Sequence, residues 1–340
     1  MGFRWAKLTC AEVGPPKDAV RFSDDLDVRW REWATEETRR RAILAHYIID
    51  GCLGTIFGSS PAARHLGNTL HLCPSDASFA ASDSAVWQFL EDASEPLGPG
   101  ETFALVYHSI FDRGHVSWLS EMSTMDKMTV IEGLGSLVME WGESGGPTVG
   151  QIDLPAIVEA MLHLLRNMDT QPDSGHKITA MLRWHCIMIQ ATEMADRRYH
   201  EGIRVGMTPR LRRALLHANA IRSLVKRLTF ETASTASFIV PIVILKAKGV
   251  FETFLAEPIV ASASPPTDIN LAHEVDWSSL GPVGIAEVES NSTSPSQAAR
   301  FVLSAGAALI DGIQVGPQDL YPLTSALAVF SQVWQRQDLA

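Results

Sequence analysis

The chain has 340 residues, of which 46% are hydrophobic and only 20% are charged, so it can bury a large core, and long disordered tails are not expected. The formal net charge is −11 and the basic clusters are short, so nothing in the sequence predicts direct contact with nucleic acid. The four cysteines are too far apart for a zinc finger or a binuclear zinc cluster, so neither a DNA-binding module nor a bound metal is expected.

Targeting signals are absent from the sequence. The N-terminal segment MGFRWAKLTC has no apolar region of the secretory type, and Ala6 stands where a myristoylation motif needs Ser or Thr. The most apolar stretch, Phe238 to Leu245, is much shorter than a membrane span. We therefore expect a soluble intracellular protein, cytoplasmic or nuclear, with no membrane partner.

The first predicted helix begins after Ser23-Asp24-Asp25, a cluster typical of a helix N-terminus, and runs to about Phe57. One face of this helix is marked by residues at steps of three and four: Trp30, Trp33, Glu37, Arg40, Leu44, Tyr47 and Gly51. Two acid–base pairs, Glu36 with Arg40 and Glu37 with Arg41, have the favourable i,i+4 order.

The rest of the chain also shows helical patterns. Gly142 is expected to stop one of these helices, and Pro241 is expected to break or kink another. The pattern predicts a short helix and loop over 61–72, then helices over 83–91, 101–113, 117–141 (an amphipathic run), 155–168, 176–194, 209–228, 236–255, 297–310 and 317–336. No strand pattern of useful length and no internal repeat appears, so the predicted fold class is all-α. We expect one domain over 1–340, with an N-terminal extension at 1–23 and a loop-rich excursion at 257–296.

Four stretches in the right order resemble a known family. The first is WREWATEETRRRAILAHYIID at 30–50, with its Trp-x-x-Trp, Glu, Arg-Arg and final Asp. It resembles the fungal-specific transcription factor domain, or middle homology region, and is most similar to members that carry two-Cys-two-His zinc fingers. The family's other features are matched by LRWHCIMI at 182–189, RRALLHANAIRSLVKRL at 212–228 and the run from Phe301 to Trp334.

The resemblance implies a large helical regulatory domain over most of the chain, from about Trp30 onward. Family members of this type usually carry zinc modules and a linker ahead of this domain, whereas here Met1 lies only a short way before Trp30. Either such a module has been removed or the domain stands alone, and we expect the second.

Three residues are candidates for catalysis. His185 and His217 lie on apolar helices and can act as general acid or base, because imidazole titrates near neutral pH, although a core histidine with satisfied hydrogen bonds is the commoner reason for such a position. Asp50 ends an apolar run, where it serves either as a polar anchor in a pocket or in a core ion pair with Arg183 or another arginine.

Four further residues are candidate walls of a substrate pocket, namely Tyr47, Trp184, His108 and Trp118, although an aromatic residue on an apolar helix face usually belongs to the core. His65, His71 and Cys73 could in principle bind a metal, but their spacing matches no familiar closed site.

Motifs for nucleotide cofactors, phosphate loops, serine hydrolases and zinc proteases are missing, so no cofactor is expected. The preferred interpretation is a stand-alone domain that binds a small hydrophobic metabolite. It would catalyse a cofactor-free, non-redox cyclisation, cycloaddition or isomerisation in secondary metabolism. The alternative is a ligand-responsive regulatory domain of a transcription factor or co-regulator, without direct DNA contact. An interaction or dimerisation module remains a third interpretation, and a homodimer is left open.

Overall fold

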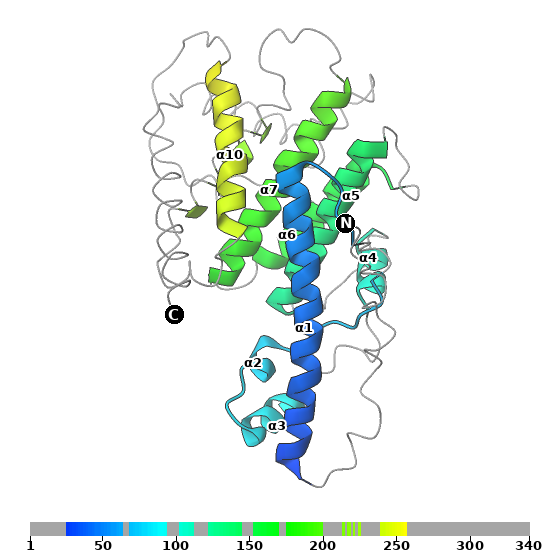
Figure 1. The fold of residues 1–340 in the computed structure, drawn as a ribbon, viewed down its shortest axis with the longest axis vertical. Coiled ribbons are helices and arrows are strands. Elements are labelled where there is room, and N and C mark those ends of the chain that lie inside the picture. Colours follow the sequence, from blue (N-terminus) through cyan, green and yellow to red (C-terminus); the bar gives the residue numbers. More distant parts are fainter. Residues whose placement is uncertain are drawn as a thin grey trace. The chain divides into compact units, whose positions relative to one another are not determined.

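The computed structural model describes residues 25–63, 68–93, 102–111, 122–144, 152–169, 175–199, parts of 213–225, and 239–256. Its named helices are α1 (Leu26–Phe57), α2 (Asp76–Phe79), α3 (Ser84–Ala93), α4 (Phe103–Phe111), α5 (Thr124–Ser144), α6 (Leu154–Asp169), α7 (Gly175–Tyr199) and α10 (Ile239–Ala256) (Figure 1). The described parts of 213–225 are helical as well.

Within these ranges there is no strand, only one antiparallel bridge between His71 and Thr102, so the predicted all-α class is confirmed. The chain forms two compact units, one of residues 1–53 and 61–136 and the other of residues 54–60 and 137–340. The helices expected over 297–310 and 317–336 lie outside the described residues, as do the extension at 1–23 and the excursion at 257–296.

Helix α1 matches its prediction from end to end. Asp25 stands just before it and its carboxylate accepts a hydrogen bond from the backbone N–H of Asp27, so this residue of the predicted cluster lies at the helix start as expected. Leu44 is fully buried and lies on the predicted apolar face. Of the expected ion pairs, Glu37 with Arg41 is present, and Arg40, expected to pair with Glu36, binds Glu37 one turn away.

In the first unit, α2 and α3 lie beside the N-terminal part of α1 (Figure 1). The rings of Trp33 on α1 and Trp87 on α3 have centroids 5.4 Å apart, so half-buried Trp33, on the predicted face of α1, packs against the buried Trp87. The N-terminus of α2 is capped by the Ser75 hydroxyl, which accepts from the backbone N–H of Ser78. The short helix expected over 61–72 does not appear among the described residues of that range.

Helix α5 differs from its prediction in three ways. It begins at Thr124 because the Ser123 hydroxyl accepts the backbone N–H of Asp126, which is the geometry of an N-cap. It is buried without interruption from Asp126 to Met139, so it is a core helix and not an amphipathic one. It also continues through Gly142 to Ser144.

Glycine is required at two positions of α5 because neighbouring side chains lie close to the helix backbone there, and not because the helix ends. A Cβ atom on Gly133 would lie 1.8 Å from the Tyr107 hydroxyl oxygen. A Cβ atom on Gly142 would lie 2.5 Å from the Met194 sulfur. The absence of a side chain at these positions therefore lets neighbouring side chains pack against the helix backbone.

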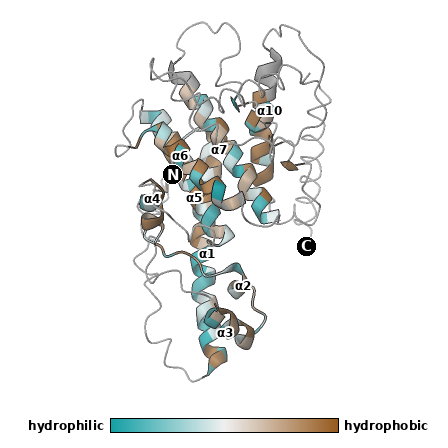
Figure 2. Cartoon of the chain, turned by 180° about the vertical axis from the view of Figure 1, so that it is seen from behind, coloured by the Kyte–Doolittle hydropathy of each residue, from teal (hydrophilic) through white to brown (hydrophobic). Residues whose placement is uncertain are grey.

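In the second unit, α7 packs against both α6 and α10. The indole N–H of Trp184 on α7 donates to the backbone carbonyl of Met161 on α6 at 2.7 Å, which fixes the two helices against each other. Apolar residues predominate on α10 (Figure 2). The expected break at Pro241 is wrong, because α10 begins at Ile239 and proline in a first turn removes no intrahelical hydrogen bond.

None of the helices in the described ranges is both long and apolar enough to cross a membrane.

Candidate functional site

Two residues that the sequence singled out separately meet in the core of the second unit. The Nδ1 atom of His185 on α7 lies 2.9 Å from the Nδ1 atom of His217, whose residue belongs to the helical part of 213–225. The two ring centroids are 5.3 Å apart and the ring planes are inclined by 55°. We call this contact the histidine pair.

Trp184 completes the arrangement. Its ring meets the His185 ring edge to face at 4.9 Å and the His217 ring at 5.5 Å. Because the indole N–H is held by the Met161 carbonyl, the tryptophan has a fixed orientation against both imidazoles. The structure thus brings together three of the seven predicted site residues.

The histidine pair is shielded from water, since both side chains have 0% exposure. Burial lowers the pKa of His185 to about 3. Burial also lowers the pKa of His217, and the neighbouring His185 and the charge of Arg213 lower it further. Both imidazoles are therefore neutral at physiological pH, and each ring carries a single N–H proton.

Arg213 is the charged residue that acts on the histidine pair. Its side chain is fully buried, and burial lowers its pKa to about 10, which still leaves the guanidinium protonated at neutral pH. Arg183, next to Trp184 on α7, is also buried and donates to the Thr55 hydroxyl at 2.8 Å. The positive charge of Arg213 makes an imidazolium at His217 unfavourable.

The other predicted site residues do not join the histidine pair. Asp50 is partly buried, and its carboxylate accepts the backbone N–H of Ala63 at 2.7 Å, which ties the segment after α1 to that helix. Tyr47 is partly buried in the first unit. The pKa of the neighbouring Tyr107 phenol is raised by burial, then by Glu132, and last by Tyr47. His108 is exposed on α4, and Trp118 lies outside the described residues.

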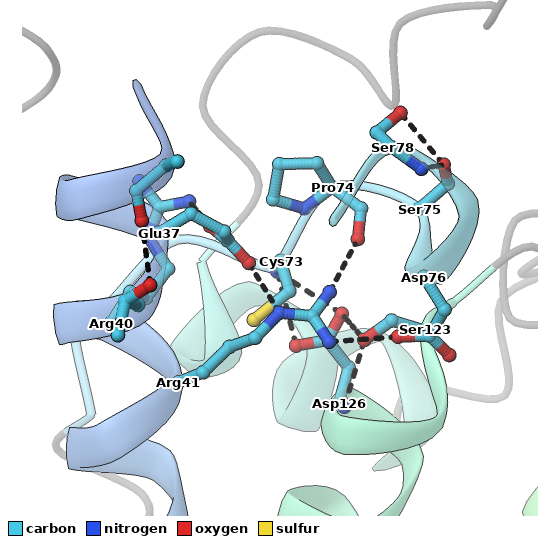
Figure 3. A network of polar contacts seen from close by, with 12 residues as sticks. Glu37, Arg40, Arg41, Cys73, Pro74, Ser75, Asp76, Ser78, Ser123 and Asp126 are labelled. Atoms are coloured by element: carbon cyan, nitrogen blue, oxygen red, sulfur yellow. Dashed lines mark hydrogen bonds and ion pairs between the residues drawn. The ribbon is translucent and has the colours of Figure 1, made fainter. Parts of the chain in front are cut away.

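The first unit holds a charged cluster of which the sequence predicted only the pair of Glu37 with Arg41 (Figure 3). Arg41 is its centre: its guanidinium donates to Glu37 at 2.7 Å, to Asp76 at 2.9 Å and to the Pro74 carbonyl at 3.2 Å. The same group lies 4.2 Å from the ring centroid of Phe79, a cation–π contact. One side chain of α1 therefore binds α2 and the segment before it.

Two carboxylates of the cluster hold the start of α5. Asp76 accepts the backbone N–H of Thr124 at 3.0 Å. Burial by itself would raise the pKa of Asp76, but this hydrogen bond and Arg41 outweigh burial and lower it. Asp126 accepts the backbone N–H of Cys73 at 3.1 Å and the Ser123 hydroxyl at 2.8 Å.

Asp126 is fully buried, and burial raises its pKa to about 7 in spite of these hydrogen bonds. Burial also lowers the pKa of the neighbouring Lys127 to about 8. The pattern Ser123-x-x-Asp126 ahead of an apolar run is a helix-start signature, and it could have located this part of the cluster from the sequence. Asp76 and Pro74, the other partners of Arg41, could not have been found in this way, because they lie 35 and 33 positions away in the chain.

The described residues contain no group of three or more His, Cys, Asp or Glu side chains placed to hold a metal ion. Of the weak candidate set, Cys73 is buried and its backbone binds Asp126, His71 forms the bridge with Thr102, and His65 lies outside the described residues.

Comparison of the chain with known protein families, with characterised proteins and with solved structures finds no match.

Proposed function

We propose that the second unit binds a small, uncharged, hydrophobic metabolite against the histidine pair. There the chain catalyses a cofactor-free, non-redox rearrangement: an isomerisation, cyclisation or cycloaddition in secondary metabolism. For the fold, we still expect the fungal transcription factor domain that the sequence resembles. It needs no DNA-binding module, since the product is a metabolite.

The contact between His185 and His217 carries the proposal. Two neutral imidazoles offer both a hydrogen-bond acceptor and a donor without bringing a net charge into an apolar core. Such groups suit an uncharged substrate, because charged catalytic groups would have to be desolvated before they could act there. Trp184 adds a rigid aromatic surface beside both rings.

The full burial of both imidazoles sets a condition on this function. A ligand reaches the pair only when the surrounding helices open locally, as small-molecule sites in helical domains do when binding shifts a population of states. The same condition supports a second candidate function, a regulatory domain in which the ligand stabilises the opened state and remains unchanged.

The test is turnover. The purified chain, in catalytic amounts, is incubated with an organic extract of the source organism, and the extract is followed by liquid chromatography–mass spectrometry beside a heat-killed sample. Conversion of one compound into an isomer of equal mass, many times per chain, supports the enzyme. Retention of one unchanged compound, near one molecule per chain, supports the regulatory domain. If neither conversion nor retention is observed, both functions are rejected.

Variants then connect the activity to the site. His185→Gln and His217→Gln keep a polar side chain of similar size, and each is expected to lower turnover strongly while circular dichroism still shows a helical fold. The matched control is His176→Gln, because His176 lies on the same helix α7 but is exposed to solvent. Full turnover in both core variants would remove the histidine pair from the mechanism.

A further inference from the structure

The contact of the histidine pair restricts the positions of its protons. The same atom type, Nδ1, lies on both sides of the 2.9 Å contact, so one Nδ1 must carry a hydrogen and the other must offer a lone pair. A neutral imidazole has one N–H, and both rings are neutral at physiological pH. The ring that donates through Nδ1 therefore has a basic Nε2, and the ring that accepts through Nδ1 has an Nε2–H.

We propose that His185 and His217 form a proton relay of two opposite tautomers that moves a proton between two atoms of one uncharged substrate. The inference rests on the proposed function and narrows it to one reaction class, an isomerisation by proton shift. Cyclisation and cycloaddition without proton transfer would not use such a relay.

One transfer balances without any other reactant and leaves the two rings with exchanged tautomers, which return to the starting arrangement when their N–H protons exchange with solvent. The basic Nε2 takes a proton from an activated C–H or O–H group of the substrate, and the electron pair of that bond forms a new π bond. The proton on the same ring's Nδ1 passes to the Nδ1 of the partner ring, whose Nε2–H delivers its proton to a second substrate atom. The π electrons displaced from the first site form the bond to that proton, so nothing is oxidised or reduced and the product has the same mass.

The surroundings of the pair favour this class of substrate. Neither ring gains a net charge once transfer is complete, which matters in a core where burial opposes imidazolium. The positive charge of Arg213 also disfavours a lasting imidazolium at His217. The substrate expected is therefore an uncharged, mostly apolar molecule with an activated hydrogen and a conjugated acceptor atom, such as an enolisable unsaturated ketone.

The proton arrangement is tested first, on the complete chain and without any substrate. Long-range ¹H–¹⁵N spectra of the ¹⁵N-histidine-labelled protein at neutral pH distinguish the Nδ1–H form from the Nε2–H form. Signals are assigned by their loss in His185→Gln and His217→Gln, with His176→Gln as the control. We expect one ring of each form, or the same averaged signature in both rings if the shared proton moves quickly.

An imidazolium in either ring, or two rings of one fixed tautomer, would overturn the relay whatever the protein catalyses. The reaction class is tested by running the converting extract in D₂O. A proton relay whose N–H positions have exchanged with solvent places one deuterium in the product. A product free of deuterium rejects the relay and leaves the proposed function intact, whereas the absence of any product rejects the function.

Discussion

The two units of this chain stabilise buried polar groups in opposite ways. In the first, the buried carboxylate of Glu37 forms ion pairs with Arg40 and Arg41, and Arg41 is in turn shared with Asp76. In the second, His185 and His217 are equally buried but hold each other as neutral rings.

The difference shows what decides whether a buried group keeps its charge. Around Arg41 several opposite charges converge from different segments, so their attraction offsets the loss of hydration (Figure 3). Around the histidine pair the neighbouring charge is Arg213, which has the same sign as an imidazolium, so neutrality is the favourable state. The following predictions test this contrast, beginning with the largest effect.

Arg41→Met should be the most destabilising substitution. It removes both ion pairs of the guanidinium and leaves Glu37, which is 1% exposed, paired with Arg40. Breaking a buried pair from one side costs about 3–5 kcal/mol, and the surviving Arg40 places the expected loss at the lower end. Urea denaturation measures the loss. The control Arg31→Met, at an exposed position of α1, should change stability by less than about 0.5 kcal/mol; equal effects would contradict the role of Arg41.

Acidification should affect the two units in opposite directions. The pKa of His185 is about 3 in the fold, below the ordinary value, so its contribution to stability is present above pH ~6.5 and is lost as the pH falls. The pKa of Asp126 is about 7 in the fold, above the ordinary value, so its contribution is present below pH ~3.9 and is lost as the pH rises through about 7.

Hydrogen exchange of the backbone amides at about pH 5 and about pH 7.5 measures these changes in local stability, after correction for the intrinsic exchange rate. On acidification, amides of α7 should lose protection and those at the start of α5 should gain it. His185→Gln should reduce the pH dependence of amide protection in α7, and Asp126→Asn should reduce it at the start of α5. Identical responses in both segments would contradict the contrast.

Gly133→Ala should have a smaller effect through packing alone. The new methyl group would overlap the Tyr107 ring, whose hydroxyl donates to the Thr129 carbonyl, so α4 and α5 must shift. Overpacking of this kind costs about 1–3 kcal/mol in unfolding free energy. Gly249→Ala in α10 is the control, because no atom lies within 4 Å of the added Cβ. It should stabilise the protein by about 0.5–1 kcal/mol, and destabilisation at both sites would contradict this account.

Lys246→Met should change stability least. Its ion pair with Glu193 joins α10 to α7, but the two side chains are 23% and 30% exposed, so water and salt screen the attraction. We expect a loss below about 1 kcal/mol that shrinks further in high salt, measured by denaturation at two ionic strengths. A loss as large as that of Arg41→Met would show that burial is not what separates the two ion pairs.

The sequence alone determined the helices whose signals are local. For α1, the capping cluster, the face through Leu44 and the pair of Glu37 with Arg41 all depend on residues within a few positions of one another. The ends of α5 and the role of Pro241 were misjudged because competing local signals were available: Ser123 caps α5, and a proline suits a first turn as well as a break.

The tertiary structure decided which polar groups meet. His185 and His217 were each selected from the sequence, yet nothing local indicates that the rings of residues 32 positions apart meet at 2.9 Å. The same holds for Arg41 and Asp76, which are 35 positions apart, and for Cys73 and Asp126, which are 53 apart. Helical periodicity fixes the face on which a side chain lies, whereas its partner on another helix depends on how the helices pack, and that is a property of the whole core.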